Sequence, residues 1–166
     1  HLRRRLAHVL ELDTLTRTLL DGLESSRRIT HAAIFLIDDD MRGYNLSAHV
    51  GPAPTPRVES APARPLLDRL QREGVVLIET VQRELDERRD ANDEREAETL
   101  LEIGQTLESM LASACVPIVS ERGEVYGLLC VRDDRLRDAF SPEEVSMLRG
   151  LAAQAAVAIE NSHLYG

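Results

Sequence analysis

The sequence predicts an α+β fold. We expect a central antiparallel sheet of five to six strands, with the terminal helices packed on one face and a lid of short helices and loops on the other. Three observations predict this class. Helical patterns occupy both ends of the chain, at 2–26 and 141–165. Apolar segments of strand length lie between them, and a Gly-containing turn at 122–123 joins the last two as a hairpin.

The first part of the chain predicts a helix followed by two strands. Leucine and valine recur every three or four residues from Leu2 to Leu23, which predicts an amphipathic helix over 2–26. An apolar run at 31–38, ended by three aspartates, predicts the first strand, and the alternation at 44–50 predicts its partner. Residues 51–65 contain five of the seven prolines and are expected to form a loop.

The middle of the chain is expected to supply the lid and the remaining strands. We predict a short helix at 65–73, with Leu66, Leu67 and Leu70 facing inward, and a third strand at 75–79. Residues 82–107 are helical in pattern and crowded with charge, so we expect them to project from the body or to be mobile, anchored by Leu100, Leu101 and Ile103. A solvated lid helix without chemistry is the favoured interpretation. The fourth and fifth strands are predicted at 110–119 and 124–131.

The last helix has the clearest start signal. Ser141 is suited to the N-cap, Pro142 to the first helical position, and Glu144 closes a capping box. Five apolar residues then follow at spacings of three and four, and their small side chains would let another helix approach closely. These five residues form a helical seam: Val145, Leu148, Ala152, Ala155 and Ile159.

Composition limits the class of protein. The 166 residues suffice for one domain with a real core, at 43% hydrophobic and 30% charged residues. A net charge of −9, with every basic residue an arginine, argues against direct nucleic-acid binding. No apolar run approaches the length of a membrane span, and no signal peptide is present, so we expect a cytoplasmic domain with no membrane contact. Because the chain begins at His1, we expect a fragment of a longer protein.

Several motifs resemble GAF domains, sensory modules of bacterial multidomain signalling proteins. The start "FSPEE", the middle "LAAQAAVAIEN" and the ending "LY" are similar to the family's final helix. "AAIFLID" resembles its first strand, and "SACVPI" with "GEVYGLL" resembles its last hairpin. The order of elements matches across nearly the whole chain, although the charged segment 83–98 is longer than the usual connection.

The resemblance implies a GAF/PAS-like sensor that binds a small molecule and relays the signal through its terminal helices. The helical seam at 145–159 predicts in addition a homodimer through the terminal helices. The usual output partners are a histidine kinase of a two-component system, a diguanylate cyclase or a transcription activator. We expect no catalytic activity of the domain itself. The family's ligand lies on the sheet face opposite the terminal helices, so the candidate pocket consists of Ala33, Phe35, His49, Leu66, Leu70, Ser113, Cys115, Tyr126, Cys130 and Arg132. A filled core without a cavity is nearly as well supported.

The two cysteines are expected to face each other. A tight hairpin at Arg122-Gly123 sets Cys115 opposite Cys130, Pro117 opposite Leu128 and Val119 opposite Tyr126. A reversible disulfide is one interpretation, and two small apolar residues in a buried sheet is the favoured one. No basic residue lies close enough in sequence to activate either thiol.

No cofactor is identified from the sequence. No histidine or cysteine pair has metal-ligand spacing, so we expect no metal site. His49 could ligate haem, but a hydrogen bond at the strand edge is favoured. Each cysteine precedes valine, whereas bilin-binding relatives have histidine after the attachment cysteine, which argues against covalent bilin. Arg132-Asp133 stands where cyclic-nucleotide-binding relatives have Asn-Lys, so cyclic nucleotide binding is doubtful.

Three hypotheses therefore stay open. The first is a small-molecule sensor. The second is a degenerate domain that acts only in dimerisation. The third is a thiol redox sensor that uses Cys115 and Cys130.

Overall fold

A six-stranded antiparallel sheet organises the molecule, with the strands in the spatial order β3-β2-β1-β6-β5-β4. The structure is a computed structural model that describes residues 14, 17–18, 20–21, 29–135 and 140–165. The strands are β1 (His31–Ile37), β2 (Gly43–Val50), β3 (Arg57–Glu59), β4 (Val76–Leu77), β5 (Ala114–Val119) and β6 (Val125–Arg132). The predicted α+β class is confirmed.

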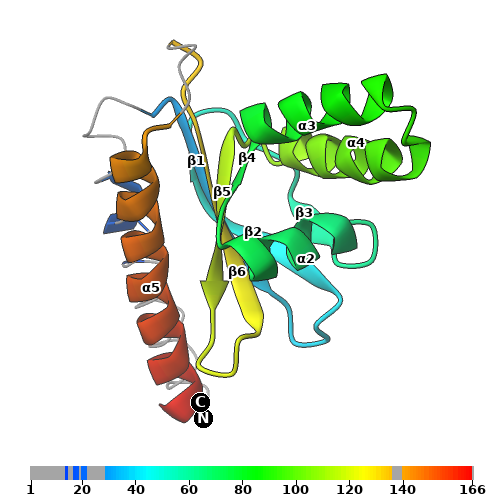
Figure 1. The fold of residues 1–166 in the computed structure, drawn as a ribbon. Helices are drawn as coiled ribbons and strands as arrows, with labels where there is room; N and C mark the ends of the chain where they lie inside the picture. Colours follow the sequence, from blue (N-terminus) through cyan, green and yellow to red (C-terminus); the bar gives the residue numbers. More distant parts are fainter. Residues whose placement is uncertain (1–13, 15–16, 19, 22–28, 136–139, 166) are drawn as a thin grey trace.

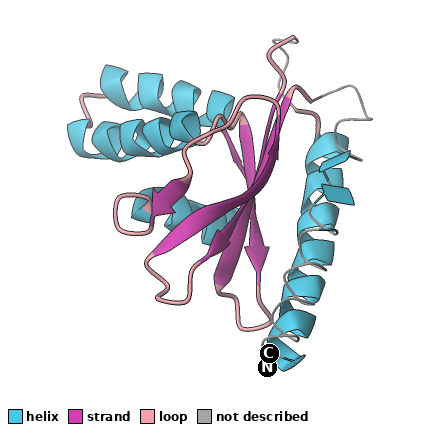
Figure 2. Cartoon of the chain, turned by 180° about the vertical axis from the view of Figure 1, so that it is seen from behind, coloured by secondary structure: helices cyan, strands magenta, loops and turns pink. Residues whose placement is uncertain are grey.

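The helices cover both faces of this sheet. Three of them, α2 (Arg64–Glu73), α3 (Ile78–Asp90) and α4 (Glu94–Ser109), lie on one side, and α5 (Pro142–Tyr165) lies on the other (Figure 1). Figure 2 shows the same arrangement from behind, with the sheet seen between the two helical layers. The sheet is therefore the middle layer, and its central strands are buried on both faces.

Alternate residues of the central strands divide the interior into two cores. The lid-side core contains Phe35, Leu128 and Cys130 of the sheet, packed against Leu66 of α2 and Leu107 of α4. The helix-side core is formed by residues from the opposite face of the sheet and from α5: Ala114, Val116, Ile118, Leu129, Val131, Leu148, Ala152, Ala155 and Ile159. The predicted division of the last hairpin into these two faces is confirmed, except at Tyr126.

Helix α5 starts as the sequence predicts. The Ser141 hydroxyl accepts from the Glu144 backbone N–H, and the Glu144 carboxylate accepts from the Ser141 N–H. This closes the capping box. We call the five seam residues of this helix the α5 seam: Val145, Leu148, Ala152, Ala155 and Ile159. The α5 seam packs on the sheet, with four of its residues buried and Val145 partly buried. Within the described residues, these small side chains bring the helix close to β5.

The charged segment forms a helical hairpin rather than one helix. Helices α3 and α4 pack against each other, joined by a turn in which Asn92 has a φ of 57°. Val81, Leu100 and Ile103 anchor the hairpin in the lid-side core, while Leu101 is exposed, contrary to prediction. Figure 1 shows the far end of the hairpin projecting from the body.

Three strand boundaries differ from the prediction. The proline-rich loop contains β3, which pairs with β2 over only three residues. The third predicted strand shrinks to Val76–Leu77 because α3 already begins at Ile78. The fourth begins at Ala114 rather than at 110, since Met110 caps the C-terminus of α4.

The predicted helix at 2–26 lies almost entirely outside the described residues. Residues 14, 17, 18, 20 and 21 are helical, and Leu20 is buried in the helix-side core. Over the part of the chain that can be described, no helix combines the length and apolar character needed to cross a bilayer.

We predict that Gly127→Ala destabilises the sheet. A Cβ at this position would lie 2.7 Å from the Phe35 carbonyl oxygen and 3.0 Å from Leu36 Cδ2, where the β1 and β6 backbones meet. Overpacking of this kind costs about 1–3 kcal/mol, measured as the free energy of unfolding in urea.

The control is Gly150→Ala in α5, where an added Cβ meets no described atom within 4 Å. That variant should gain about 1 kcal/mol, because alanine favours a helix interior over glycine. Equal effects of the two substitutions would contradict the close approach at Gly127.

Candidate functional site

The predicted pocket face is filled by its own side chains. Six of the ten candidate residues are buried in the lid-side core: Ala33, Phe35, Leu66, Leu70, Cys115 and Cys130. They pack among Leu107, Met110 and Leu128, which are each 0% exposed. The structure therefore brings these six together as a hydrophobic core, the alternative that the sequence supported nearly as well.

The other four candidates are placed apart from that core. Tyr126 faces the helix-side core, because a bulge pairs Val119 with Val125 instead of Tyr126, so the predicted Val119–Tyr126 pair is wrong. His49 is exposed, and its Nδ1 lies 3.0 Å from the Gly51 carbonyl oxygen. Ser113 and Arg132 are partly buried.

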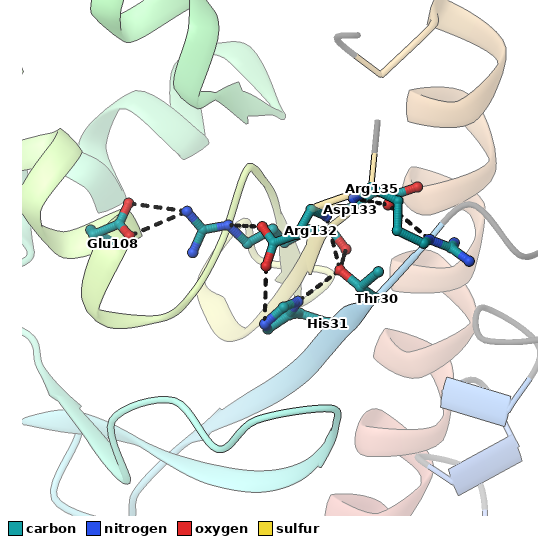
Figure 3. Close-up of polar contacts among 7 residues, drawn as sticks. Thr30, His31, Glu108, Arg132, Asp133 and Arg135 are labelled. Carbon is teal, nitrogen blue, oxygen red and sulfur yellow. Dashed lines mark hydrogen bonds and ion pairs between the residues drawn. The ribbon is translucent and has the colours of Figure 1, made fainter. Parts of the chain in front are cut away.

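Arg132 belongs to a polar network at the end of β6 (Figure 3). Its guanidinium lies 3.2 Å from Glu108 Oε1 and 3.1 Å from Asp134 Oδ1. Asp134 also faces His31, at 3.6 Å between Oδ2 and Nε2, and the Thr30 hydroxyl lies 2.8 Å from His31 Nδ1. Because two carboxylates already neutralise Arg132, it is poorly suited to hold an anionic ligand. The network joins β1, β6 and the end of α4.

The two cysteines face each other as predicted. Cys115 pairs with Cys130 across β5 and β6, with their Sγ atoms 3.7 Å apart. Met110 Sδ lies 3.9 Å from Cys130 Sγ. The hydrogen bond to Cys115, followed by burial, raises the pKa of the Cys130 thiol well above its usual value. Since the thiolate is the reactive form, this environment opposes redox chemistry at neutral pH.

A cavity of 530 Å³ lies instead at the edge of the sheet. We call it the edge groove. Its walls come from α2, from the exposed edge of β5, from the β5–β6 turn and from α5: Leu70, Gln71, Gly74, Pro117, Val119, Gly123, Arg149, Ala152, Ala153 and Ala156. The volume is within the range of small-molecule sites. Leu70 is the only residue that the predicted pocket and the described lining share.

The edge groove exists because β4 is too short to cover β5. Val76 and Leu77 pair with Cys115 and Ala114, and continuing this register would set Gly74 opposite Pro117. Gly74 instead ends α2 in a left-handed conformation, with φ 76°. Proline has no N–H to offer to a further strand, so the outer half of β5 stays open.

Three charged or polar residues of this region were missed by the sequence prediction. Arg149 and Gln71 both line the groove and are exposed. Arg69 is buried on α2, where it contacts Glu73 at 3.1 Å and forms an ion pair with Glu84 of α3. The ion pair of Arg69 with Glu84 therefore connects α2 to α3, the first helix of the charged segment. By helical periodicity all three residues belong to solvent-exposed helix faces, and nothing in the local sequence distinguishes them from other exposed residues.

A buried antiparallel sheet between a helical lid and a long terminal helix defines the class of small α+β sensory domains. The chain belongs to the GAF domain family, because the family model described as "GAF domain" matches residues 9–160. No curated protein matches the chain in sequence.

Solved structures share the fold at low sequence identity. A methyl-accepting chemotaxis protein is similar with a TM-score of 0.68 and 17% identity, over 95% of this chain and 96% of that one. A GAF domain/HD domain protein from Geobacter sulfurreducens has a TM-score of 0.66 and 16% identity, over 96% and 99%. A type II free methionine-R-sulfoxide reductase from Thermoplasma acidophilum has a TM-score of 0.59 and 15% identity, over 93% and 95%. GAF domains thus occur in signalling proteins, and the structural similarity shows that this chain shares their fold.

We predict that both thiols are unreactive toward iodoacetamide in the folded protein at pH 7. The raised pKa of Cys130 keeps its thiol protonated until the pH exceeds that higher value, and the side chains of both cysteines are buried. Mass spectrometry after a timed exposure should show unmodified protein, and the same exposure in urea should add two labels. Rapid labelling of the native protein, or a disulfide formed by mild peroxide, would revive the redox hypothesis.

Proposed function

We propose that this GAF domain is a regulatory module of a larger signalling protein. A small molecule bound in the edge groove would change the position of α5 relative to the lid and so relay a signal to an output domain. The observation that carries the proposal is that both helical layers contribute residues to the walls of the groove. Arg149, Ala152 and Ala153 belong to α5, whereas Leu70 and Gln71 belong to α2 on the other side of the sheet.

A ligand in this position contacts elements from both helical layers at once. Helix α5 packs on one face of the sheet and α2 on the other, and the groove is where both reach the edge of β5. A ligand can shift an equilibrium only by its difference in affinity for two states. Any change in the separation of α2 and α5 changes the shape of the groove, which provides such a difference.

The names of structurally similar proteins support a role in signalling. One is a methyl-accepting chemotaxis protein and another is a GAF domain/HD domain protein. The filled lid-side core supports the edge groove, rather than the face beneath the lid, as the binding site.

A dimerisation role is a second candidate, favoured by apolar side chains on the outside of α5. Val157 is 62% exposed and Met147 is 43% exposed, although most described large hydrophobic residues are buried. The α5 seam itself is occupied by the sheet. Pairing of two chains would therefore use this outer face, with Val157 at its centre.

We predict that Ala153→Phe couples α5 to α2 by filling the groove. Ala153 is exposed and lines the groove, so a phenyl ring there can reach the opposite wall. Burying about half of that ring contributes roughly 1 kcal/mol, which corresponds to about fivefold slower local opening. Hydrogen exchange should therefore slow in α5 and in the last turn of α2.

The matched control is Gln154→Phe, at the next position of α5, which is exposed and does not line the groove. It should leave the exchange of α2 unchanged. If Ala153→Phe also leaves α2 unchanged, the groove does not connect the two layers and the proposed relay is wrong.

We predict that Val157→Glu separates a dimer formed through α5. Light scattering after gel filtration should give twice the 18.5 kDa chain mass for the original sequence and a single chain mass for the variant. A surface substitution changes stability by about 0.5 kcal/mol or less. Ala91→Glu, at the exposed α3–α4 turn, is the control and should stay dimeric. A monomeric original chain at tens of micromolar would reject the dimerisation role for this chain.

A further inference from the structure

We infer that the edge groove takes an aliphatic monocarboxylate, whose carboxylate is held by Arg149. This inference rests on the proposed function and names the chemical class of its ligand. It depends on three features of the groove: an arginine that no carboxylate of the described residues contacts, walls of small aliphatic side chains, and a charge asymmetry along α5.

Arg149 differs from the other well-placed arginines near the sheet. Arg57, Arg69 and Arg132 each contact two carboxylates. By contrast, no carboxylate of the described residues lies within ion-pair distance of Arg149, although its side chain lines the cavity. A guanidinium is always charged and offers five N–H donors in a planar fork, which matches the two oxygens of a carboxylate. Arg149 therefore has the donors that a bound carboxylate requires.

The position of Arg149 is set by Gly74. A Cβ at Gly74 would lie 3.1 Å from the terminal nitrogen Nη2 of Arg149, so the guanidinium rests over the C-terminal end of α2. A cation at this end offsets the negative end of the helix dipole. This contact places the guanidinium beside Gly74, and both residues line the groove.

The walls of the groove fit a slim aliphatic body. Ala152, Ala153 and Ala156 form the α5 wall, and Pro117 and Val119 form the β5 wall. The described lining includes no aromatic side chain on which a base or another ring could stack, and Arg149 is its one cation. With a net charge of −9 on the chain, a single cation favours a monoanion over a polyphosphate.

The charge on α5 also differs between the two ends of the groove. Glu160 lies eleven residues beyond Arg149 on α5, about 16 Å along the helix axis. Its carboxylate accepts from the Glu121 backbone N–H near the β5–β6 turn, at 3.3 Å. Gln71 donates to the Gly123 carbonyl oxygen of the same turn at 3.2 Å and fixes α2 against the turn. The carboxylate of a ligand thus belongs at the Arg149 end, and its hydrocarbon tail points toward the turn.

The test is calorimetric titration of the purified chain with sodium octanoate and, in parallel, with neutral 1-octanol. Octanoate should bind saturably at one site, at least tenfold more tightly than octanol. Arg149→Gln should weaken octanoate binding by about tenfold or more, because it removes a charged hydrogen-bonding partner. Arg149→Lys should retain part of the affinity as a point charge.

Two variants serve as controls. Arg72→Gln removes the same charge from an exposed position on the last turn of α2 that does not line the groove, so its affinity should stay within twofold. Ala153→Phe should abolish octanoate binding, because the ring occupies the groove.

The outcomes separate this inference from the proposed function. Failure of octanoate to bind, equal binding of octanol, or unchanged affinity in Arg149→Gln would each overturn the carboxylate assignment. Octanoate binding that persists in Ala153→Phe would place the site elsewhere and overturn it as well. The coupling of α5 to α2 in hydrogen exchange is measured without any ligand. The proposed relay can therefore stand when the carboxylate assignment fails, and it can fail when octanoate binds.

Discussion

Burial of the sheet on both faces is the constraint on which the rest of the structure depends. The central strands β1, β6 and β5 must present apolar side chains alternately to the lid and to α5, and only the sheet's edges and ends can carry polar chemistry. The strands therefore read as nearly continuous apolar runs. The contact of Gly127 with the Phe35 carbonyl shows how closely the two middle strands approach each other.

This constraint decides where a ligand can bind. The lid-side face is occupied by Phe35, Leu107 and their neighbours, with two buried thiols in the middle. Opening a cavity there would cost the packing energy of several fully buried side chains. The edge of β5 needs no such opening, because β4 ends after two residues and α2 ends at Gly74. The only side chain that both sites share, Leu70, separates the core from the groove.

The predicted pairing of Cys115 with Cys130 across β5 and β6 is correct, but the turn that joins the two strands differs from the predicted one. The turn spans three residues, since the Ser120 N–H donates to the Glu124 carbonyl oxygen, and Gly123 takes the left-handed conformation. This three-residue loop shifts the pairing of β5 with β6 by one residue from the predicted register, and the bulge at Tyr126 restores the predicted register. Cys115 therefore still faces Cys130, while Tyr126 moves to the opposite face. A bulge leaves no local sequence signal, so this residue could not be placed in advance.

Long-range contacts account for the other differences. A charged residue such as Arg69 is expected at the surface. It is buried instead, because it pairs with Glu84, which lies fifteen residues away on another helix. Strand β3 depends on three residues pairing with β2 within a proline-rich segment. The groove is formed by four elements, and its essential residue Arg149 is an ordinary exposed position of α5 by periodicity. The start of α5 and its capping box, in contrast, depend on residues within one turn and were predictable.

The geometry of α5 links these conclusions to signalling. Its inner face is fixed to the sheet by Leu148, Ala152 and Ile159, and the neighbouring face lines the groove through Arg149 and Ala153. A ligand that spans Arg149 and the edge of β5 would add contacts on one side of the helix only. In the proposed relay, α5 responds by a small shift along or across the sheet, and a helix of 24 residues would transmit that shift to its far end as a rigid body.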